Sequence, residues 1–310
     1  MFLILVASAA PARAGDRYAL VITGASGGDE YAQKYDRWRT TFLSTLRERF
    51  GYPPDRLVVL AETESEGVER CTRENVRRVL ADLRRRLTKD DQLLVVLIGH
   101  GSSLDGDDAK FNLVGPDMTA TEWADLLRPI PARLIFVNTT GASFPFLAKL
   151  AGRGRVVLTA TDSAAQRFET IFPEYFVNAF DDPAADNDKN GRVSIWEAFA
   201  YASAAVRQTF EQKGQLPTER PLLDDTGAGV QRSFEQKGQL PTERPLLDDT
   251  GAGIGREAQN PGADGAVASV TYLQPDAAAS LPGDTAVSAL LKRRFGPDGC
   301  RTASSGRRTI

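Results

Sequence analysis

The feature that most limits the fold of this chain is an alternation of short apolar runs with amphipathic stretches through its first two-thirds. Five runs are nearly continuous in apolar residues, which is typical of strands that helices cover on both faces. They lie at residues 18–23, 56–60, 93–98, 134–138 and 156–160. Strands that alternate with helices in this way predict an α/β fold of three layers, with a mostly parallel sheet between two layers of helices.

The stretches between these runs repeat their apolar residues with the spacing of helices. We predict helices at residues 30–50, 73–87, 120–127, 144–150 and 173–180, and a short hairpin strand at residues 111–114. In such sheets, ligands and catalytic groups collect at the carboxyl ends of the strands. Here those ends carry the polar segments 24–28, 100–102, 138–141 and 161–163.

The chain has a single histidine and two cysteines. Any mechanism that needs an imidazole must use His100, and a zinc site with several histidines is excluded. Cys71 and Cys300 could pair in an oxidising compartment, but their spacing does not decide this. The net charge of −3 gives no global argument for binding to nucleic acid, so a nucleic-acid partner is not expected.

The N-terminal residues 1–14 predict a signal peptide. Their apolar run is too short to cross a bilayer but has the length of a signal-peptide core, although no Lys or Arg precedes it. Ala12 and Ala14 fit the small-residue cleavage motif, which leaves Gly15 as the first mature residue. We therefore expect a periplasmic or secreted protein with no integral membrane segment after signal removal.

The last third contains an exact repeat. Residues 210–229 have the sequence FEQKGQLPTERPLLDDTGAG, and residues 234–253 repeat it without change at a period of 24. Two copies are too few for a solenoid, so one copy is expected in the native place and the other looped out. We predict an α/β domain at 15–207, the duplication at 208–254 and a poorly ordered tail at 255–310, with one strand-like stretch at 267–273.

Two strand ends carry a family resemblance. The run 93–98 leads into His100-Gly101, and the run 134–138 ends at Asn138 and is followed by Thr139-Thr140. This pattern, over residues 18–206, resembles the caspase-like clan of cysteine peptidases, and within it the legumain-type peptidases and their bacterial exported relatives. In that family one core strand ends in His-Gly, and the next ends in an acidic residue, a small residue and the nucleophilic cysteine.

The resemblance implies a caspase-like sheet and a role for each matching residue. His100 falls on the catalytic histidine, Gly101 on the residue whose N–H helps to bind the oxyanion, and Thr140 on the position of the cysteine. A hydroxyl needs strong base assistance to attack, and an internal threonine lacks the terminal amine that threonine nucleophiles use. We therefore expect an impaired pseudopeptidase with a groove for a peptide or protein partner. The alternative is an active peptidase with Thr140 as nucleophile and His100 as base.

Residues 186–197, with the sequence DNDKNGRVSIWE, fit the twelve-residue EF-hand loop. Gly191 supplies the sharp turn of such a loop. The expected ligands are Asp186, Asp188, Asn190, the carbonyl of Arg192, Ser194 and Glu197. A lone loop predicts a structural Ca²⁺ site. The alternative is an Asp/Asn-rich turn before a helix, with Ser194 as its N-cap.

Two other interpretations stay open. Residues 21–28, VITGASGG, resemble the glycine-rich first turn of short-chain dehydrogenases, a class of nucleotide-binding oxidoreductase. Asp29 and Glu30 follow where a pyrophosphate would approach, and two carboxylates would repel it. The other interpretation is a calcium-stabilised binding module in which the sheet is only a scaffold.

Overall fold

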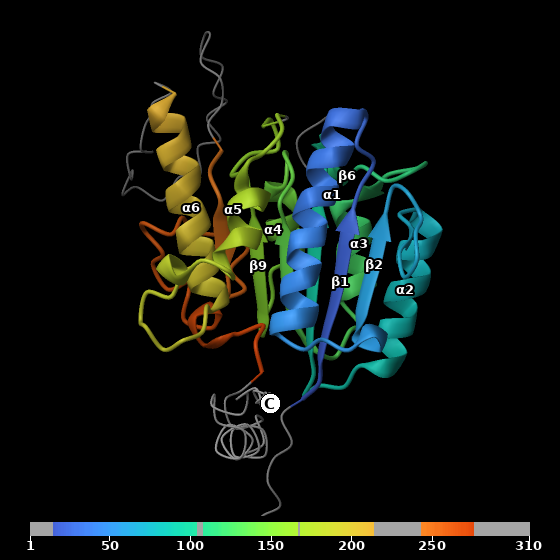
Figure 1. Ribbon diagram of the computed structural model, residues 1–310, viewed down its shortest axis with the longest axis horizontal. Coiled ribbons are helices and arrows are strands. Elements are labelled where there is room, and N and C mark those ends of the chain that lie inside the picture. Colours follow the sequence, from blue (N-terminus) through green and yellow to red (C-terminus); the bar gives the residue numbers. More distant parts are fainter. Residues whose placement is uncertain (1–14, 104–107, 167, 214–242, 276–310) are drawn as a thin grey trace, which may run out of the picture. The chain divides into compact units, whose positions relative to one another are not determined.

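The computed structural model describes residues 15–103, 108–166, 168–213 and 243–275. Its centre is a seven-stranded sheet with helices on both faces (Figure 1), so the expected mixed α/β fold with a mostly parallel sheet is confirmed. The strand order is β10-β9-β8-β4-β1-β2-β3, and only β10 runs antiparallel to its neighbour. The strands are β1 (Arg17–Thr23), β2 (Leu57–Ala61), β3 (Glu69–Arg70), β4 (Gln92–Ile98), β8 (Arg133–Asn138), β9 (Arg155–Thr159) and β10 (Leu246–Asp248).

Alternate residues of each strand face two separate apolar cores, which is why the strands are apolar throughout. In β1, Ala19 and Val21 lie in one core with helices α1, α5 and α6, whereas Leu20 and Ile22 lie in the other with α2, α3 and α4. The helices are α1 (Asp29–Ser44), α2 (Arg73–Arg86), α3 (Ala120–Leu127), α4 (Phe144–Leu150), α5 (Phe172–Ala179) and α6 (Ile195–Gln212).

The strands and helices predicted up to residue 180 agree with the observed ones apart from their ends, whereas the edge strands β3 and β10 are not among the predicted strands. The first helix was expected to run to residue 50, but it ends as an α-helix at Ser44 and continues as a π-helical turn over Thr45–Arg49. The hairpin strand expected at 111–114 lies earlier, as β6 (Lys110–Phe111). It is the middle strand of a small antiparallel sheet with β5 (Gly101–Ser102) and β7 (Met118–Thr119).

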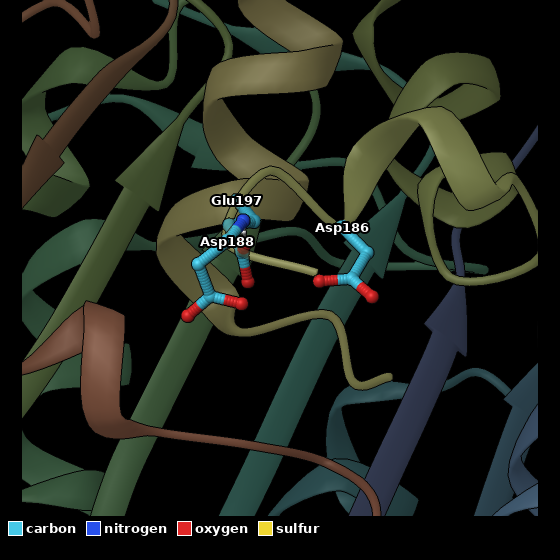
Figure 2. Close-up of side chains that lie close together, drawn as sticks. All are labelled: Asp186, Asp188 and Glu197. Carbon is cyan, nitrogen blue, oxygen red and sulfur yellow. Dashed lines mark hydrogen bonds between the residues drawn. The ribbon is translucent and has the colours of Figure 1, made fainter. Parts of the chain in front are cut away.

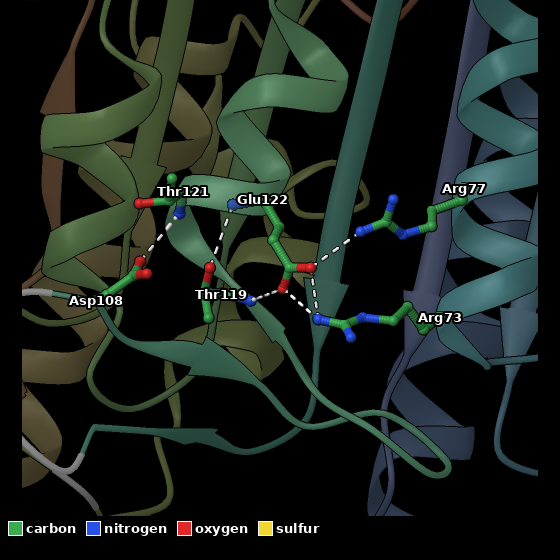
Figure 3. A network of polar contacts seen from close by, with 6 residues as sticks. All are labelled: Arg73, Arg77, Asp108, Thr119, Thr121 and Glu122. Atoms are coloured by element: carbon green, nitrogen blue, oxygen red, sulfur yellow. Dashed lines mark hydrogen bonds and ion pairs between the residues drawn. The ribbon is translucent and has the colours of Figure 1, made fainter.

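A polar network joins two helices on the second face. Arg73 and Arg77 of α2 both reach Glu122 near the start of α3 (Figure 3). Glu122 also accepts a hydrogen bond from the backbone N–H of Thr119, whose hydroxyl accepts one from the N–H of Glu122 in return. This reciprocal capping box satisfies the free N–H groups at the helix start. Both carboxylate oxygens of Glu122 are already bonded to these partners. The network therefore holds α2 against α3 and is no ligand site.

Residues 255–273 differ from the expected poorly ordered tail, because they pack against the domain and bury Ala268 and Leu273. The strand-like stretch at 267–273 is also wrong, since Ala268–Val270 form a 3₁₀ turn. The physical reason is Asp249, whose carboxylate accepts hydrogen bonds from the N–H groups of Gly265, Val267 and Ala268 and curls this segment. Tight N–H donation to one carboxylate is incompatible with an extended strand.

Several expectations lie outside the described residues: the signal peptide at 1–14, the tail beyond 275 and Cys300. Cys71 is a buried free thiol, and burial raises its pKa well above the ordinary value. Within the described ranges, none of the helices is long and apolar enough to cross a membrane.

Candidate functional site

His100 lies where the order of the strands in the sheet reverses. Strand β1 has β2 on one side and β4 on the other, so the crevice at their carboxyl ends is a topological switch point, the usual ligand position in open α/β sheets. His100 follows β4 there, and its Nε2 lies 3.0 Å from the carbonyl oxygen of Ser26 and 3.1 Å from the hydroxyl of Tyr35. A carbonyl oxygen can only accept, so the bond to Ser26 holds only when Nε2 carries a proton.

Aromatic rings from α1 enclose the imidazole. The ring of Tyr31 stands edge-on at a centroid distance of 4.8 Å, and that of Tyr35 at 5.5 Å. Burial, followed by the nearby carboxylate of Glu169, raises the pKa of Tyr35 far above its ordinary value. The Tyr35 hydroxyl therefore stays protonated at neutral pH, and it is a fixed hydrogen-bond partner rather than a charged one.

Thr140 is fully buried at the end of β8. Its hydroxyl oxygen lies 2.8 Å from the Oδ1 of Asn138 and 3.0 Å from the carbonyl oxygen of Gly141. Both partners are acceptors, so the single hydroxyl proton is used within the turn itself. The backbone N–H of Thr140 also donates to Asn138 Oδ1 at 3.0 Å. Asn138 thus organises the turn at the place where the resemblance expects an acid.

The tips of β4 and β8 meet at Gly101. A Cβ atom added to Gly101 would lie 2.1 Å from the carbonyl oxygen of Gly141 and 2.5 Å from the hydroxyl oxygen of Thr140. Only glycine fits this close approach, which explains why a glycine follows His100. The three predicted catalytic residues are therefore gathered at one edge of the sheet. Even so, no hydrogen bond among the described residues joins His100 to Thr140.

Other hydroxyl groups at this edge are also engaged. The Thr139 hydroxyl donates to the carbonyl of Leu97 at 2.7 Å, and the hydroxyls of Ser143 and Thr161 lie 3.0 Å apart. All three hydroxyl side chains are buried. Of the described polar atoms here, the Nδ2 of Asn138 is buried without a hydrogen-bond partner. The cluster closes the ends of β8 and β9 and keeps these hydroxyl groups away from solvent.

A small cavity of about 60 Å³ lies beside the histidine. Ser26 and Tyr35, which contact His100, line it together with Asp36, Arg39 and Glu62. Sites for drug-sized ligands are several-fold larger, on the order of 300–1,000 Å³. In this conformation the cavity has room for water or a small polar group.

A second candidate site is the acidic cluster of Asp186, Asp188 and Glu197. One carboxylate oxygen from each lies within 4.8 Å of the others, and the group could hold a metal ion. Figure 2 shows the carboxylate of Asp186 directed toward those of Asp188 and Glu197. Three of the six predicted ligands are therefore brought together.

Hydrogen bonds within the loop fix this arrangement. Asp186 accepts from the N–H groups of Asn190 at 3.1 Å and Gly191 at 2.8 Å. Gly191 has a φ of 82°, which requires glycine in the turn. The side-chain oxygen of Asn190 accepts from the N–H of Arg192 at 2.8 Å, so it faces the loop backbone.

The start of α6 uses Glu197 and Ser194 as a capping box. Glu197 accepts from the N–H of Ser194 at 2.9 Å through one oxygen and from the N–H of Asn187 at 2.9 Å through the other. The Ser194 hydroxyl accepts from the N–H of Glu197. The N-cap role of Ser194 is therefore confirmed, and it coexists with the acidic cluster.

The loop is anchored by residues that the sequence did not single out. Ile195 N–H donates to the carbonyl of Thr271 at 2.9 Å, and Ser194 and Tyr272 form an isolated antiparallel bridge. The guanidinium of Arg192 lies 3.9 Å from the ring centroid of Tyr272. No local signal predicts this contact, because the partners are about 80 residues apart.

Glu243 and Arg244 are further polar residues that the sequence analysis missed. Glu243 is buried and accepts from the N–H groups of Ile171 and Phe172, where α5 begins, at 2.8 and 2.7 Å. Burial raises its pKa to about 8, against the lowering effect of these two donors. Arg244 donates to Asp162 at 2.6 Å and also pairs with Glu257. Both residues fasten the segment before β10 to the sheet.

Comparisons with known proteins do not assign a family. No protein-family model matches the chain, and no curated protein does. Among solved structures, protein GSU0716 from Geobacter sulfurreducens has a TM-score of 0.41 at 13% identity, over 61% of this chain and 89% of that one. Raptor from Chaetomium thermophilum has a TM-score of 0.36 at 11% identity, over 56% of this chain and 19% of that one. At these scores neither likeness carries an argument about fold or function.

Proposed function

We propose that this protein is a caspase-like, legumain-type pseudopeptidase that has kept the strand-tip arrangement of a peptidase and lost the ability to cut. The observation that carries the proposal is the state of Thr140. Its hydroxyl is buried and donates within its own turn, while the Nε2 of His100 is bonded to Ser26 and Tyr35.

The chemistry of acyl transfer supports this proposal. A hydroxyl nucleophile must pass its proton to a base within about 2.6–3.2 Å as it attacks, and a third group must orient that base. The Thr140 hydroxyl donates to an amide oxygen and a backbone carbonyl oxygen. Both are too weakly basic to take its proton. Among the described residues, no carboxylate forms a hydrogen bond with His100. The active-peptidase alternative would need both tips to rearrange.

The test uses purified protein and a mixed peptide library, with wild type, Thr140→Cys, Thr140→Val and His100→Ala. We expect no cleavage by wild type. Thr140→Val is the matched control for Thr140→Cys, because both remove the hydroxyl and only one introduces a thiol. Cleavage that appears with Thr140→Cys and needs His100 would indicate that the groove persists for a peptide or protein partner. Silence in both variants would favour the binding-module interpretation.

We further propose that the acidic cluster binds Ca²⁺ as a structural ion. The support is a set of oxygen donors at EF-hand spacing, with Asp186, Asp188 and Glu197 close together. Hard oxygen ligands suit Ca²⁺, and extracellular sites of this kind bind on the order of 10⁻⁴–10⁻³ M. An EF-hand loop uses a bidentate carboxylate at its twelfth position, and for Glu197 that role requires at least one of its hydrogen bonds to loop N–H groups to lengthen. An exported protein would meet millimolar Ca²⁺, which agrees with the expected periplasmic or secreted location.

The dehydrogenase alternative is disfavoured by the surroundings of its glycine-rich turn. Ala25 N–H donates to the carbonyl of Asn112 at 3.0 Å, and a Cβ on Gly24 would lie 2.3 Å from that oxygen. The close approach that a pyrophosphate would need at Gly24 is therefore taken by the protein's own backbone. Asp29 and Glu30 occupy the first turn of α1, where they would repel phosphate.

A further inference from the structure

The edge of the sheet beside β9 is built from the second copy of the exact repeat. β10 pairs with β9 through Leu246, Leu247 and Asp248, and Leu247 is fully buried. Just before the strand, Glu243 caps the start of α5 and Arg244 pairs with Asp162. Of the first copy, the structure describes residues 210–213, which form the end of α6. The structure therefore takes the beginning of the repeat from one copy and its end from the other.

The first copy carries the same residues 24 positions earlier. Glu219 and Arg220 correspond to Glu243 and Arg244, and Leu223 corresponds to Leu247. Because residues 218–229 and 242–253 are identical, every contact made from within one segment can be made by the other. The acceptors Asp248 and Asp249, which curl the following chain, have their equivalents in Asp224 and Asp225.

The connections do not decide between the two segments. Phe210 near the end of α6 and Glu243 line the same small cavity, so the gap to be bridged is short. Residues 214–218 would bridge it with the first copy in place, since five extended residues span up to roughly 17 Å. The extra 24 residues would then follow the strand instead of preceding it. Loop-closure entropy changes by only about 0.6 kcal/mol for each doubling of loop length, so moving the loop alters stability little.

We propose that the slot beside β9 accepts either copy, so that the native protein exists in two arrangements of the chain offset by 24 residues. The occupant is residues 242–253 in one arrangement and residues 218–229 in the other, on an otherwise unchanged domain. Exchange requires release of one edge strand and its flanking turns, without unfolding of the five central parallel strands.

The first test compares the thermal midpoints of full-length Leu223→Asp, Leu247→Asp and the double variant. A buried aspartate in the slot is strongly unfavourable, so each single variant should place its unchanged copy there. Its thermal midpoint should then fall by less than about 2 °C. The double variant has no intact copy and should lose about 6–12 °C. The proposal is overturned if Leu247→Asp lowers the thermal midpoint as far as the double variant does while Leu223→Asp leaves the midpoint unchanged.

The second test traps each arrangement and does not depend on stability. Leu247 exchanges both backbone hydrogen bonds with Arg256, so it faces Leu158 of β9 as a non-hydrogen-bonded pair, where Cα atoms are close enough for a disulfide. We expect oxidation to form a cross-link in Leu158→Cys/Leu223→Cys as well as in Leu158→Cys/Leu247→Cys, both within a monomer by mass. A cross-link with position 247 alone would show that a single arrangement exists.

Discussion

The most informative perturbation of the acidic cluster is Asp188→Asn. Asp188 is exposed and accepts from the N–H of Asn190 at 3.0 Å through one oxygen. An asparagine keeps an oxygen for that bond and has nearly the same shape. The substitution therefore removes one negative charge from the cluster and keeps the backbone hydrogen bond of the turn, while it gives up the bond that the other oxygen accepts from the Asn190 side-chain amide at 2.8 Å. Glu197→Gln would be a poorer choice, because Glu197 also caps α6.

The size of the effect follows from linkage. A ligand that binds only the folded state stabilises it by RT ln(1 + [L]/Kd). With a Kd on the order of 10⁻⁴–10⁻³ M and about 10 mM Ca²⁺, the gain is about 1.4–2.7 kcal/mol. For a domain of this size, that corresponds to a rise in thermal midpoint of about 3–10 °C. Losing one of three carboxylates should weaken binding at least about tenfold, which leaves a gain of at most about 0.4–1.4 kcal/mol and removes about half of this rise or more.

The assay measures thermal midpoints of wild type and Asp188→Asn with EDTA, Ca²⁺ and Mg²⁺. Asp90→Asn is the matched control, since Asp90 is an exposed acid paired with Lys89 and stands outside the cluster. The midpoints of wild type and Asp90→Asn should rise equally with Ca²⁺ and less with Mg²⁺, while that of Asp188→Asn should rise by about half as much as wild type or less. An equal rise in all three proteins would refute a site at this cluster.

Three further outcomes follow from the strand tips and the buried carboxylate. Gly101→Ala should lower the free energy of unfolding by about 1–3 kcal/mol in urea titration, because its Cβ would collide with Gly141; an unchanged value contradicts the close approach. Burial raises the pKa of Glu243 from 4.5 to about 8, so stability should be highest below pH 4.5 on account of this group and decline as pH rises toward 8. Because Glu219 of the first repeat copy can take the same place, Glu243→Gln combined with Glu219→Gln should flatten that decline, and an unchanged pH profile of this double variant would refute it. A cysteine in Thr140→Cys should react with thiol reagents no faster in the native protein than buried Cys71 does.

Five of the seven strands of the main sheet and the position of His100 could be predicted from the sequence because they depend on local pattern, whereas the short edge strands β3 and β10 could not. An uninterrupted apolar run of five to seven residues is enough to predict a strand with two covered faces. The rule that site residues gather at carboxyl ends then brings residues 100 and 140 to one edge. The capping box at Ser194 and Glu197 is equally local, since it depends on a spacing of three residues.

What could not be predicted depends on contacts between distant segments. The residues after 254 look weakly structured by composition, yet Asp249 holds them through three backbone N–H groups. Nor does a sequence show where a hydroxyl proton points. Thr140 was placed correctly at the strand tip, but its donation to Asn138 or Gly141 depends on the turn geometry.

The central claim is that the strand tips form a peptidase-like site without a working nucleophile. The most direct measurement is peptide cleavage by the wild-type protein, with saturating Ca²⁺ and with EDTA, followed by mass spectrometry of the library. The account predicts no cleavage above that of the Thr140→Val variant in either condition. Cleavage by wild type that disappears in both Thr140→Val and His100→Ala would contradict it and make Thr140 the nucleophile.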